Sequence, residues 1–326
     1  MLPFFIVGAP RTGTTLLRRI LTANAVVAIP SESLFIAEYL RAEQVPLAER
    51  TRLFLRDPDL EAWGASWPAD MFDGLSSMAD VVRRAHEVFA EQNNARVWGQ
   101  KTPRLVRHWQ TLGERFPNAR FIHAVREPRA VVASLKRSKA HQLNVLVGSR
   151  RWRDDTRRGL EMEAGLGERV FQCRYEELVG APEAVVQRIC DFLELTYEPA
   201  MLEVPEQKLT LHASEDRAGH HVRVAEPISA ASGERWKKDL SANEQRVVVA
   251  VTHEVARDAG YTLPNAAAVT RAERLRFGAM HALTAAQKVA QAASTAELTL
   301  RRANRHMRLG SIGRVIAELA GGRPPA

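Results

Sequence analysis

The sequence has few cysteines and no long apolar run. Only two of its 326 residues are cysteine, Cys173 and Cys190, and neither lies in a pair with metal-ligand spacing. This usage argues against both a disulfide framework and a structural zinc site. No stretch approaches the roughly 18 uninterrupted apolar residues of a membrane-spanning helix. We therefore expect a cytoplasmic protein, since a reducing compartment is the default for a chain without disulfides.

The first apolar run does not have the features of a secretory signal peptide. No charged residue precedes the first apolar run, PFFIVGA, and no small-residue cleavage site follows it. A signal peptide would need both features. The run is better explained as a buried strand.

Most of the chain carries almost no net charge. The net charge is +8, but residues 265–326 hold ten Lys and Arg against three Glu, which leaves +1 for residues 1–264. We predict a domain over 1–264, with a helical insertion at about 40–95, and a basic helical tail over 265–326. The tail has three open interpretations: packing on the domain, pairing with a second copy in a homo-oligomer, or peripheral contact with an anionic membrane. Nucleic acid is not expected, because no aromatic residues interleave with the basic ones.

Short apolar runs separated by helical stripes indicate the fold. Continuous apolar character, rather than strict alternation, is typical of parallel strands that are covered on both faces. A repeated order of strand, loop and helix predicts an α/β fold with a central parallel sheet flanked by helices, as in P-loop NTPases. The predicted strands are Phe4–Val7, Val26–Ile29, Val97–Gly99, Arg120–Val125 and Arg169–Cys173.

One lysine is absent where a nucleotide-triphosphate loop would need it. The stretch GAPRTGTTLL, residues 8–17, follows the first predicted strand and nearly matches G-x-x-x-x-G-K-[ST], but Thr14 replaces the lysine. A glycine loop that enters a helix still directs backbone N–H groups and a positive dipole end at one point. Arg11 adds a forked cation that suits phosphate or sulfate. The loop therefore predicts an anion site with less charge for a triphosphate and its metal.

A second anion site is predicted in FIHAVREPRAVVASLKRS, residues 121–138. Arg126 follows a predicted strand, Pro128 suits a helix start, and Ser134 lies eight residues after Arg126, about two helical turns along. Two anion sites in one sheet match a ligand that is phosphorylated at both ends of a nucleoside.

Together the two motifs resemble those of sulfotransferases that use 3′-phosphoadenosine-5′-phosphosulfate (PAPS). Residues 11–16 are similar to the family's 5′-phosphosulfate loop, R-x-G-T-[ST]-L, and residues 126–134 to its 3′-phosphate motif, R-[DE]-P-R-x-x-x-x-S. RYEELVGAPEAVVQRICDFLEL, residues 174–195, and the stretch 220–244 extend the resemblance over about residues 1–260. The motif layout is closest to the tyrosylprotein, Golgi-type enzymes.

The resemblance implies PAPS as donor, 3′-phosphoadenosine-5′-phosphate (PAP) as product, and no metal. Glu32, which lies 21 residues past Arg11, would be the general base, and Lys101 in WGQKTPR would approach the leaving phosphate. Some relatives use a histidine base, for which His123 and His108 are weaker candidates. The implied donor-binding residues are Arg11, Thr12, Gly13, Thr14, Thr15, Arg126, Ser134, Tyr175 and Arg235.

The acceptor is less clearly indicated. Leu34 stands two residues after Glu32, where the tyrosylprotein enzymes carry an arginine. We therefore expect the hydroxyl or amine of a small molecule, glycan or lipid in a bacterial-type enzyme. Two alternatives remain: a P-loop kinase with a degenerate loop, which would need ATP and Mg²⁺, and a non-catalytic nucleotide-binding module.

Overall fold

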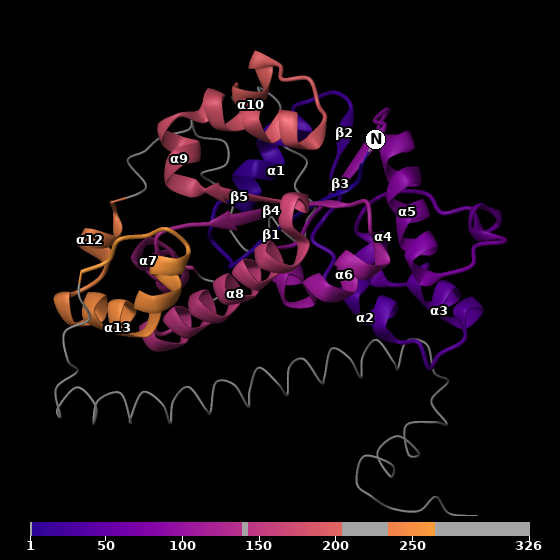
Figure 1. Cartoon of the computed structure of the whole chain (residues 1–326). Helices are drawn as coiled ribbons and strands as arrows, with labels where there is room; N and C mark the ends of the chain where they lie inside the picture. Colours follow the sequence, from indigo (N-terminus) through magenta and orange to yellow (C-terminus); the bar gives the residue numbers. More distant parts are fainter. Residues whose placement is uncertain (1, 139–142, 204–233, 265–326) are drawn as a thin grey trace, which may run out of the picture. The chain divides into compact units, whose positions relative to one another are not determined.

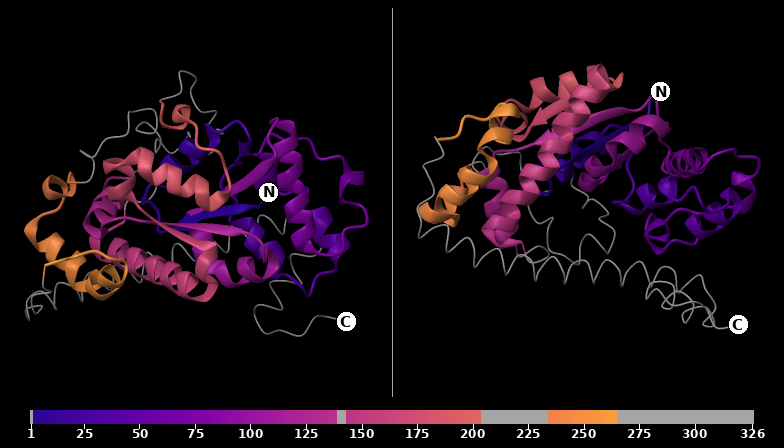
Figure 2. Two further views of the ribbon diagram at one scale, coloured as in Figure 1. Left: turned by 45° about the horizontal axis from the view of Figure 1, so that its top comes forward. Right: turned by 60° about the horizontal axis from the view of Figure 1, so that its bottom comes forward.

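Five parallel strands form one sheet in the computed structural model, which describes residues 2–138, 143–203 and 234–264. The strand order is β2-β3-β1-β4-β5, and helices lie on both sides of the sheet (Figures 1 and 2). The predicted α/β class is confirmed, although the second strand is shorter than predicted. The bounds are β1 Phe4–Gly8, β2 Val27–Ala28, β3 Val97–Lys101, β4 Arg120–Val125 and β5 Val170–Arg174.

Helical elements connect the strands. The insertion predicted at about 40–95 spans α3, α4, η1 and α5, and it packs against the edge of the sheet near β2 and β3 (Figure 1). The bounds are α1 Thr14–Thr22, α2 Phe35–Arg41, α3 Leu47–Phe54, α4 Pro58–Glu61, η1 Ala69–Phe72, α5 Met78–Gln92, η2 Pro103–His108, α6 Trp109–Arg115, α7 Pro128–Arg137, α8 Val145–Leu166, η3 Gly167–Arg169, α9 Tyr175–Gly180, α10 Pro182–Leu193, η4 Pro199–Leu202, α12 Trp236–Asp239 and α13 Ala242–Asp258.

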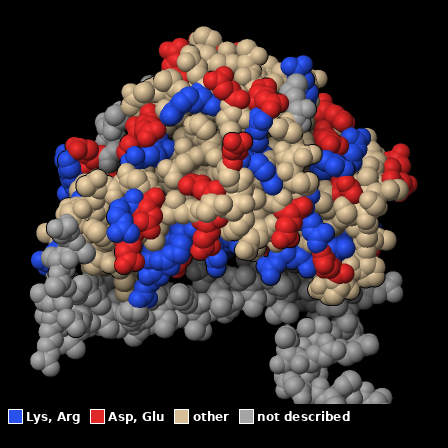
Figure 3. All heavy atoms as spheres, viewed as in Figure 1, with Lys and Arg blue, Asp and Glu red and all other residues tan. Residues whose placement is uncertain are grey.

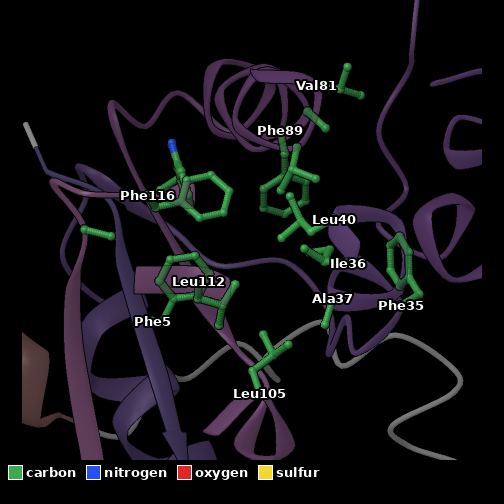
Figure 4. Packing of buried hydrophobic residues seen from close by; sticks show 14 of the residues in the cluster. Phe5, Phe35, Ile36, Ala37, Leu40, Val81, Phe89, Leu105, Leu112 and Phe116 are labelled. Atoms are coloured by element: carbon green, nitrogen blue, oxygen red, sulfur yellow. The ribbon is translucent and has the colours of Figure 1, made fainter. Parts of the chain in front are cut away.

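Alternate residues of β1 pack into opposite layers, as the two-residue repeat of a strand requires. Phe4 and Ile6 join a cluster with side chains of α1 and α10. Phe5 joins the cluster formed by α2, α5 and α6, where it lies beside Leu112 and Phe116 (Figure 4). Burial of one such aromatic ring contributes about 1.5–3 kcal/mol. Both faces of the sheet are thus covered, which explains the continuous apolar runs.

A third cluster holds the helix after β4 in place. Pro128 occupies the first turn of α7, and the Glu127 side chain caps the helix by accepting a hydrogen bond from the Ala130 N–H. Val131 and Leu135 of α7 pack with Trp152 of α8 and with residues of α13. Trp152 Nε1 donates to the Arg126 carbonyl at 2.9 Å. These contacts fix the turn that carries Arg126.

Acidic and basic side chains are interspersed on the face shown in Figure 3. Within the described ranges, no helix is long and apolar enough to cross a membrane. The predicted tail, 265–326, lies outside the described residues, so the predicted domain boundary and the roles of the tail remain predictions.

Candidate active site

The residues singled out from the sequence follow successive strands. Because all five strands are parallel, their carboxyl ends meet at one edge of the sheet, where ligands bind in open α/β folds. The residues concerned are Arg11 after β1, Glu32 after β2, Lys101 at the end of β3, Arg126 after β4 and Tyr175 after β5.

The glycine loop has the backbone expected of an anion cradle. Gly13 is the N-cap of α1 in a left-handed conformation with φ 98°, and no side chain caps this helix in the described part of the chain. Arg11 also has a positive φ, 72°, a strained conformation for a residue other than glycine that often occurs at functional sites. Thr12 Oγ1 donates to the Ala9 carbonyl at 2.7 Å and tightens the turn. The first N–H groups of α1 are therefore available to an anion.

Tyr175 closes one side of this loop. A Cβ on Gly13 would lie 2.6 Å from Cδ2 of the Tyr175 ring, so only glycine fits there. The Arg126 guanidinium stacks on the same ring at 3.8 Å from its centroid. The tyrosine thus touches both predicted anion sites.

The two predicted anion sites adjoin each other. Arg11 Nε donates to Ser134 Oγ at 3.0 Å, and Arg126 Nη1 donates to the Arg11 carbonyl at 3.3 Å. Sequence reasoning assigned Arg11 to one site and Ser134 to the other, without a contact between them. Their hydrogen bond joins the two predicted anion sites into one group of side chains at the ends of β1 and β4.

Glu32 and Lys101 form an ion pair at the same sheet edge. Lys101 Nζ lies 2.5 Å from Glu32 Oε1; the lysine side chain is 0% exposed and the glutamate side chain is 46% exposed. A hydrogen bond in which both donor and acceptor are charged is stronger than one between neutral groups. A proton acceptor that solvent can reach therefore sits directly on a buried cation.

Side chains that sequence reasoning missed hold the segment around Glu32. Thr102 Oγ1 accepts from the Ser33 N–H at 2.7 Å, and Gln100 Nε2 donates to the Ser31 carbonyl at 3.2 Å. Trp63 Nε1, from the insertion, donates to Ser33 Oγ at 2.9 Å. No sequence pattern signals these bonds, because each partner lies at least 30 residues from the segment it holds.

The histidines raised as alternative bases lie in packed surroundings. His123 is completely buried in β4, with its Nδ1 2.5 Å from Glu163 Oε1 on α8. Burial, followed by the cations of Arg41, Arg107 and Arg104, lowers the pKa of His108 in η2.

Arg235 lies at the N-terminus of the short helix α12. The next residue, Trp236, is covered by the Arg129 guanidinium at 3.9 Å from the ring centroid, so α12 packs on α7. Arg235 Nε itself is 3.9 Å from Asp239 Oδ2. Its contact with a donor remains a prediction, as does the absence of a metal; within the described residues, no three His, Cys, Asp or Glu side chains are grouped to hold one.

Comparison with known proteins connects this geometry to one family. The model described as "Sulfotransferase family" matches residues 3–199, which include every site residue above except Arg235. Among curated proteins, the chain is 27% identical over 218 residues to the protein-tyrosine sulfotransferase A of Caenorhabditis elegans. That match covers 61% of this chain and 52% of the relative, so the chain spans about half of the relative's length.

Two solved structures are similar over most of the chain. The sulfotransferase domain from the curacin biosynthetic pathway is 25% identical, with a TM-score of 0.58, and the match covers 80% of this chain and 98% of that domain. The sulfotransferase domain from the Synechococcus PCC 7002 olefin synthase is 27% identical, with a TM-score of 0.58 and coverages of 80% and 96%.

Proposed function

The chain belongs to the sulfotransferase family and is therefore a sulfuryl-transferring enzyme; we propose that its donor is PAPS and that the residues gathered at the sheet edge carry out the transfer. The observation that carries this proposal is that the Lys101–Glu32 pair and the bonded group of Arg11, Ser134 and Arg126 lie at the same edge of the sheet.

Two parts of this sheet edge suit the two ends of the donor. The N–H groups of the Gly13 turn and the hydroxyls of Thr14 and Thr15 hold the 5′-phosphosulfate. Arg126 and Ser134 hold the 3′-phosphate, for which the guanidinium fork provides two parallel donors. Arg11 bonds to Ser134 and reaches between these two places.

The transfer itself is a displacement at sulfur. The acceptor hydroxyl loses its proton to the Glu32 carboxylate while its oxygen forms a bond to sulfur. The bond between sulfur and the bridging phosphate oxygen breaks, and its electron pair stays on PAP. Lys101 offsets the charge that develops on that oxygen. Because the lysine is fully buried, the surrounding low dielectric makes this stabilisation stronger than it would be in water.

We keep the hydroxyl or amine of a small molecule, glycan or lipid as the proposed acceptor. The curated relatives are named as protein-tyrosine sulfotransferases, but this chain has Leu34 two residues after Glu32. A protein acceptor and a small acceptor are distinguished by an acceptor screen with labelled donor.

Calorimetry tests the donor assignment. PAP is titrated against the protein beside ATP with Mg²⁺ and beside adenosine 5′-phosphate. We expect PAP to bind at least tenfold more tightly than either, because only PAP fills both anion positions. Preferred binding of ATP with Mg²⁺ would favour the kinase alternative and refute the proposal.

A further inference from the structure

Three arginines gather where η2 packs against α8. In a 3₁₀ helix, side chains three residues apart eclipse each other, so Arg104 and Arg107 project from the same side of η2. On α8, Arg151 and Asp155 are four residues apart and also share a face. The two faces meet in a cluster, defined here as Arg104, Arg107, Arg151 and Asp155.

The single carboxylate of the cluster is already engaged. Arg107 donates from Nε and Nη2 to the two Asp155 oxygens at 2.5 and 3.0 Å. Asp155 is only 1% exposed, so this fork joins η2 to α8 in a buried setting. Arg151 Nε lies 4.0 Å from the same carboxylate, at the limit of an ion pair. One carboxylate thus contacts two of the three guanidinium groups, and its charge also acts to raise the pKa of the third, Arg104.

Arg104 and Arg151 keep hydrogen-bonding capacity. In residues 2–138, 143–203 and 234–264, the Nε atoms of both side chains are buried and have no hydrogen-bond partner. Burial lowers the pKa of Arg151 to about 10, with the Arg107 and Arg104 cations as further causes. Burial and the Arg107 cation also lower the pKa of Arg104. Cations that have lost water without gaining a full set of partners are stabilised when an anion binds.

The cluster adjoins the Glu32–Lys101 pair. Arg104 comes three residues after Lys101, directly behind the end of β3. The carboxylates of Glu32 and of Glu38 on α2 act to raise the pKa of Arg104, against the larger lowering by burial. The hydroxyl acted on by Glu32 and a group bound by Arg104 could therefore belong to one molecule.

We propose that Arg104 and Arg151 bind an anionic group, a carboxylate or a phosphate, on the acceptor whose hydroxyl is presented to Glu32. This inference rests on the proposed function and narrows its acceptor to an acidic one. Arg107 and Asp155 play a different part, because their buried fork already holds η2 on α8 without the other two arginines.

The test uses phenolic acceptor probes that carry either an anionic or a neutral group at the same position. The protein is first saturated with PAP, so that the donor positions cannot take the probe. Calorimetry then compares 4-hydroxyphenylacetate and 4-hydroxybenzylphosphonate with the neutral methyl ester of 4-hydroxyphenylacetate. We expect at least one anion to bind tenfold or more tightly than the ester, and the stronger of the two identifies carboxylate or phosphate as the preferred group.

The variants separate binding from folding. Arg104→Gln and Arg151→Gln should remove most of the preference for the anion while PAP affinity stays unchanged. Arg153 lies on the same helix and pairs with Asp154. Arg153→Gln should therefore keep the preference for the anion. The inference is overturned if the native protein binds anion and ester equally. It is also overturned if the Arg153 variant loses as much of the preference for the anion as the Arg104 and Arg151 variants do. Failure of PAP to bind in the first step would instead count against the proposed function.

Discussion

Arg11 Nε donates to Ser134 Oγ at 3.0 Å although 123 residues separate them in the chain. The bond joins the loop after β1 to the second turn of α7, across two neighbouring strands. A donor molecule held at both phosphates would contact both partners of this bond.

The first prediction concerns Ser134. Replacement by Ala removes a hydroxyl from the proposed 3′-phosphate position. We expect PAP to bind roughly 10- to 150-fold more weakly, since a hydrogen bond to a charged group contributes roughly 1.5–3 kcal/mol. Calorimetry with adenosine 5′-phosphate is the control, and its affinity should hardly change. If both nucleotides weaken equally, Ser134 acts only by positioning Arg11.

The second prediction separates Glu32 from a neighbouring carboxylate. Glu32→Gln should lower kcat by roughly 10²–10⁴-fold, because general-base catalysis contributes about that much. PAP affinity should stay within about twofold of the native value. Glu38→Gln, on the exposed side of α2, is the matched control and should retain the native rate. Full turnover by the Glu32 variant would show that another group takes the proton.

The third prediction concerns two glycines on α8. A Cβ on Gly159 would overlap the His123 ring, which Glu163 holds in place, whereas a Cβ on Gly148 would meet Val132 Cγ1 at 3.5 Å, an ordinary contact. Gly159→Ala should destabilise the fold by about 1–3 kcal/mol through overpacking. Gly148→Ala should be neutral or stabilise by up to about 1 kcal/mol, the helix preference of Ala. Urea unfolding of the two variants would contradict this account if their midpoints moved together.

The fourth prediction is a pH dependence of stability set by His86. Its ring nitrogens lie 2.8 Å from the Val82 carbonyl and 2.8 Å from Gln100 Oε1. Burial lowers the pKa of His86 to about 4, against the opposing effect of these hydrogen bonds. Well above pH 6.5, the ordinary pKa of histidine, the ring is neutral in both native and unfolded chains. As the pH falls from 6.5 towards 4, His86 binds a proton in the unfolded chain but not in the native chain. The free energy of unfolding therefore decreases.

The decrease from this group approaches about 3 kcal/mol and levels off below pH 4. Urea unfolding between pH 7.5 and 5 measures most of it. His86→Gln should be less stable at pH 7.5, because a packed ring is lost, but its stability should fall less steeply. An identical slope in native and variant proteins would mean that other groups cause the pH dependence.

Local sequence patterns were sufficient to predict the strands and the helix that carry the site residues. The runs at Phe4–Val7 and Arg120–Val125 are apolar because both faces of the sheet are covered, and the structure has strands there. Pro128 indicated a helix start in the sequence, and the structure has Pro128 in the first turn of α7. These features depend on neighbours in the chain, so they can be recognised without the fold.

Other features depend on partners that no short pattern connects. Trp63 holds Ser33 from within the insertion, and Gln100 holds Ser31 across 69 residues. The arginine cluster arises only because η2 packs on α8, and each of its cations looks like an ordinary surface residue in the sequence.

By itself, the sequence determined the strand and helix order, the glycine turn that needs a positive φ at Gly13, and the residue types that end each strand. These are local properties of backbone conformation and apolar spacing. Only the tertiary structure decided that Arg11 bonds to Ser134, that Lys101 is buried against Glu32, and that Arg151 lies at the carboxylate bound by Arg107. Such relations follow from how parallel strands bring distant loops to one edge, where burial and distance, rather than sequence separation, set the interactions between charges.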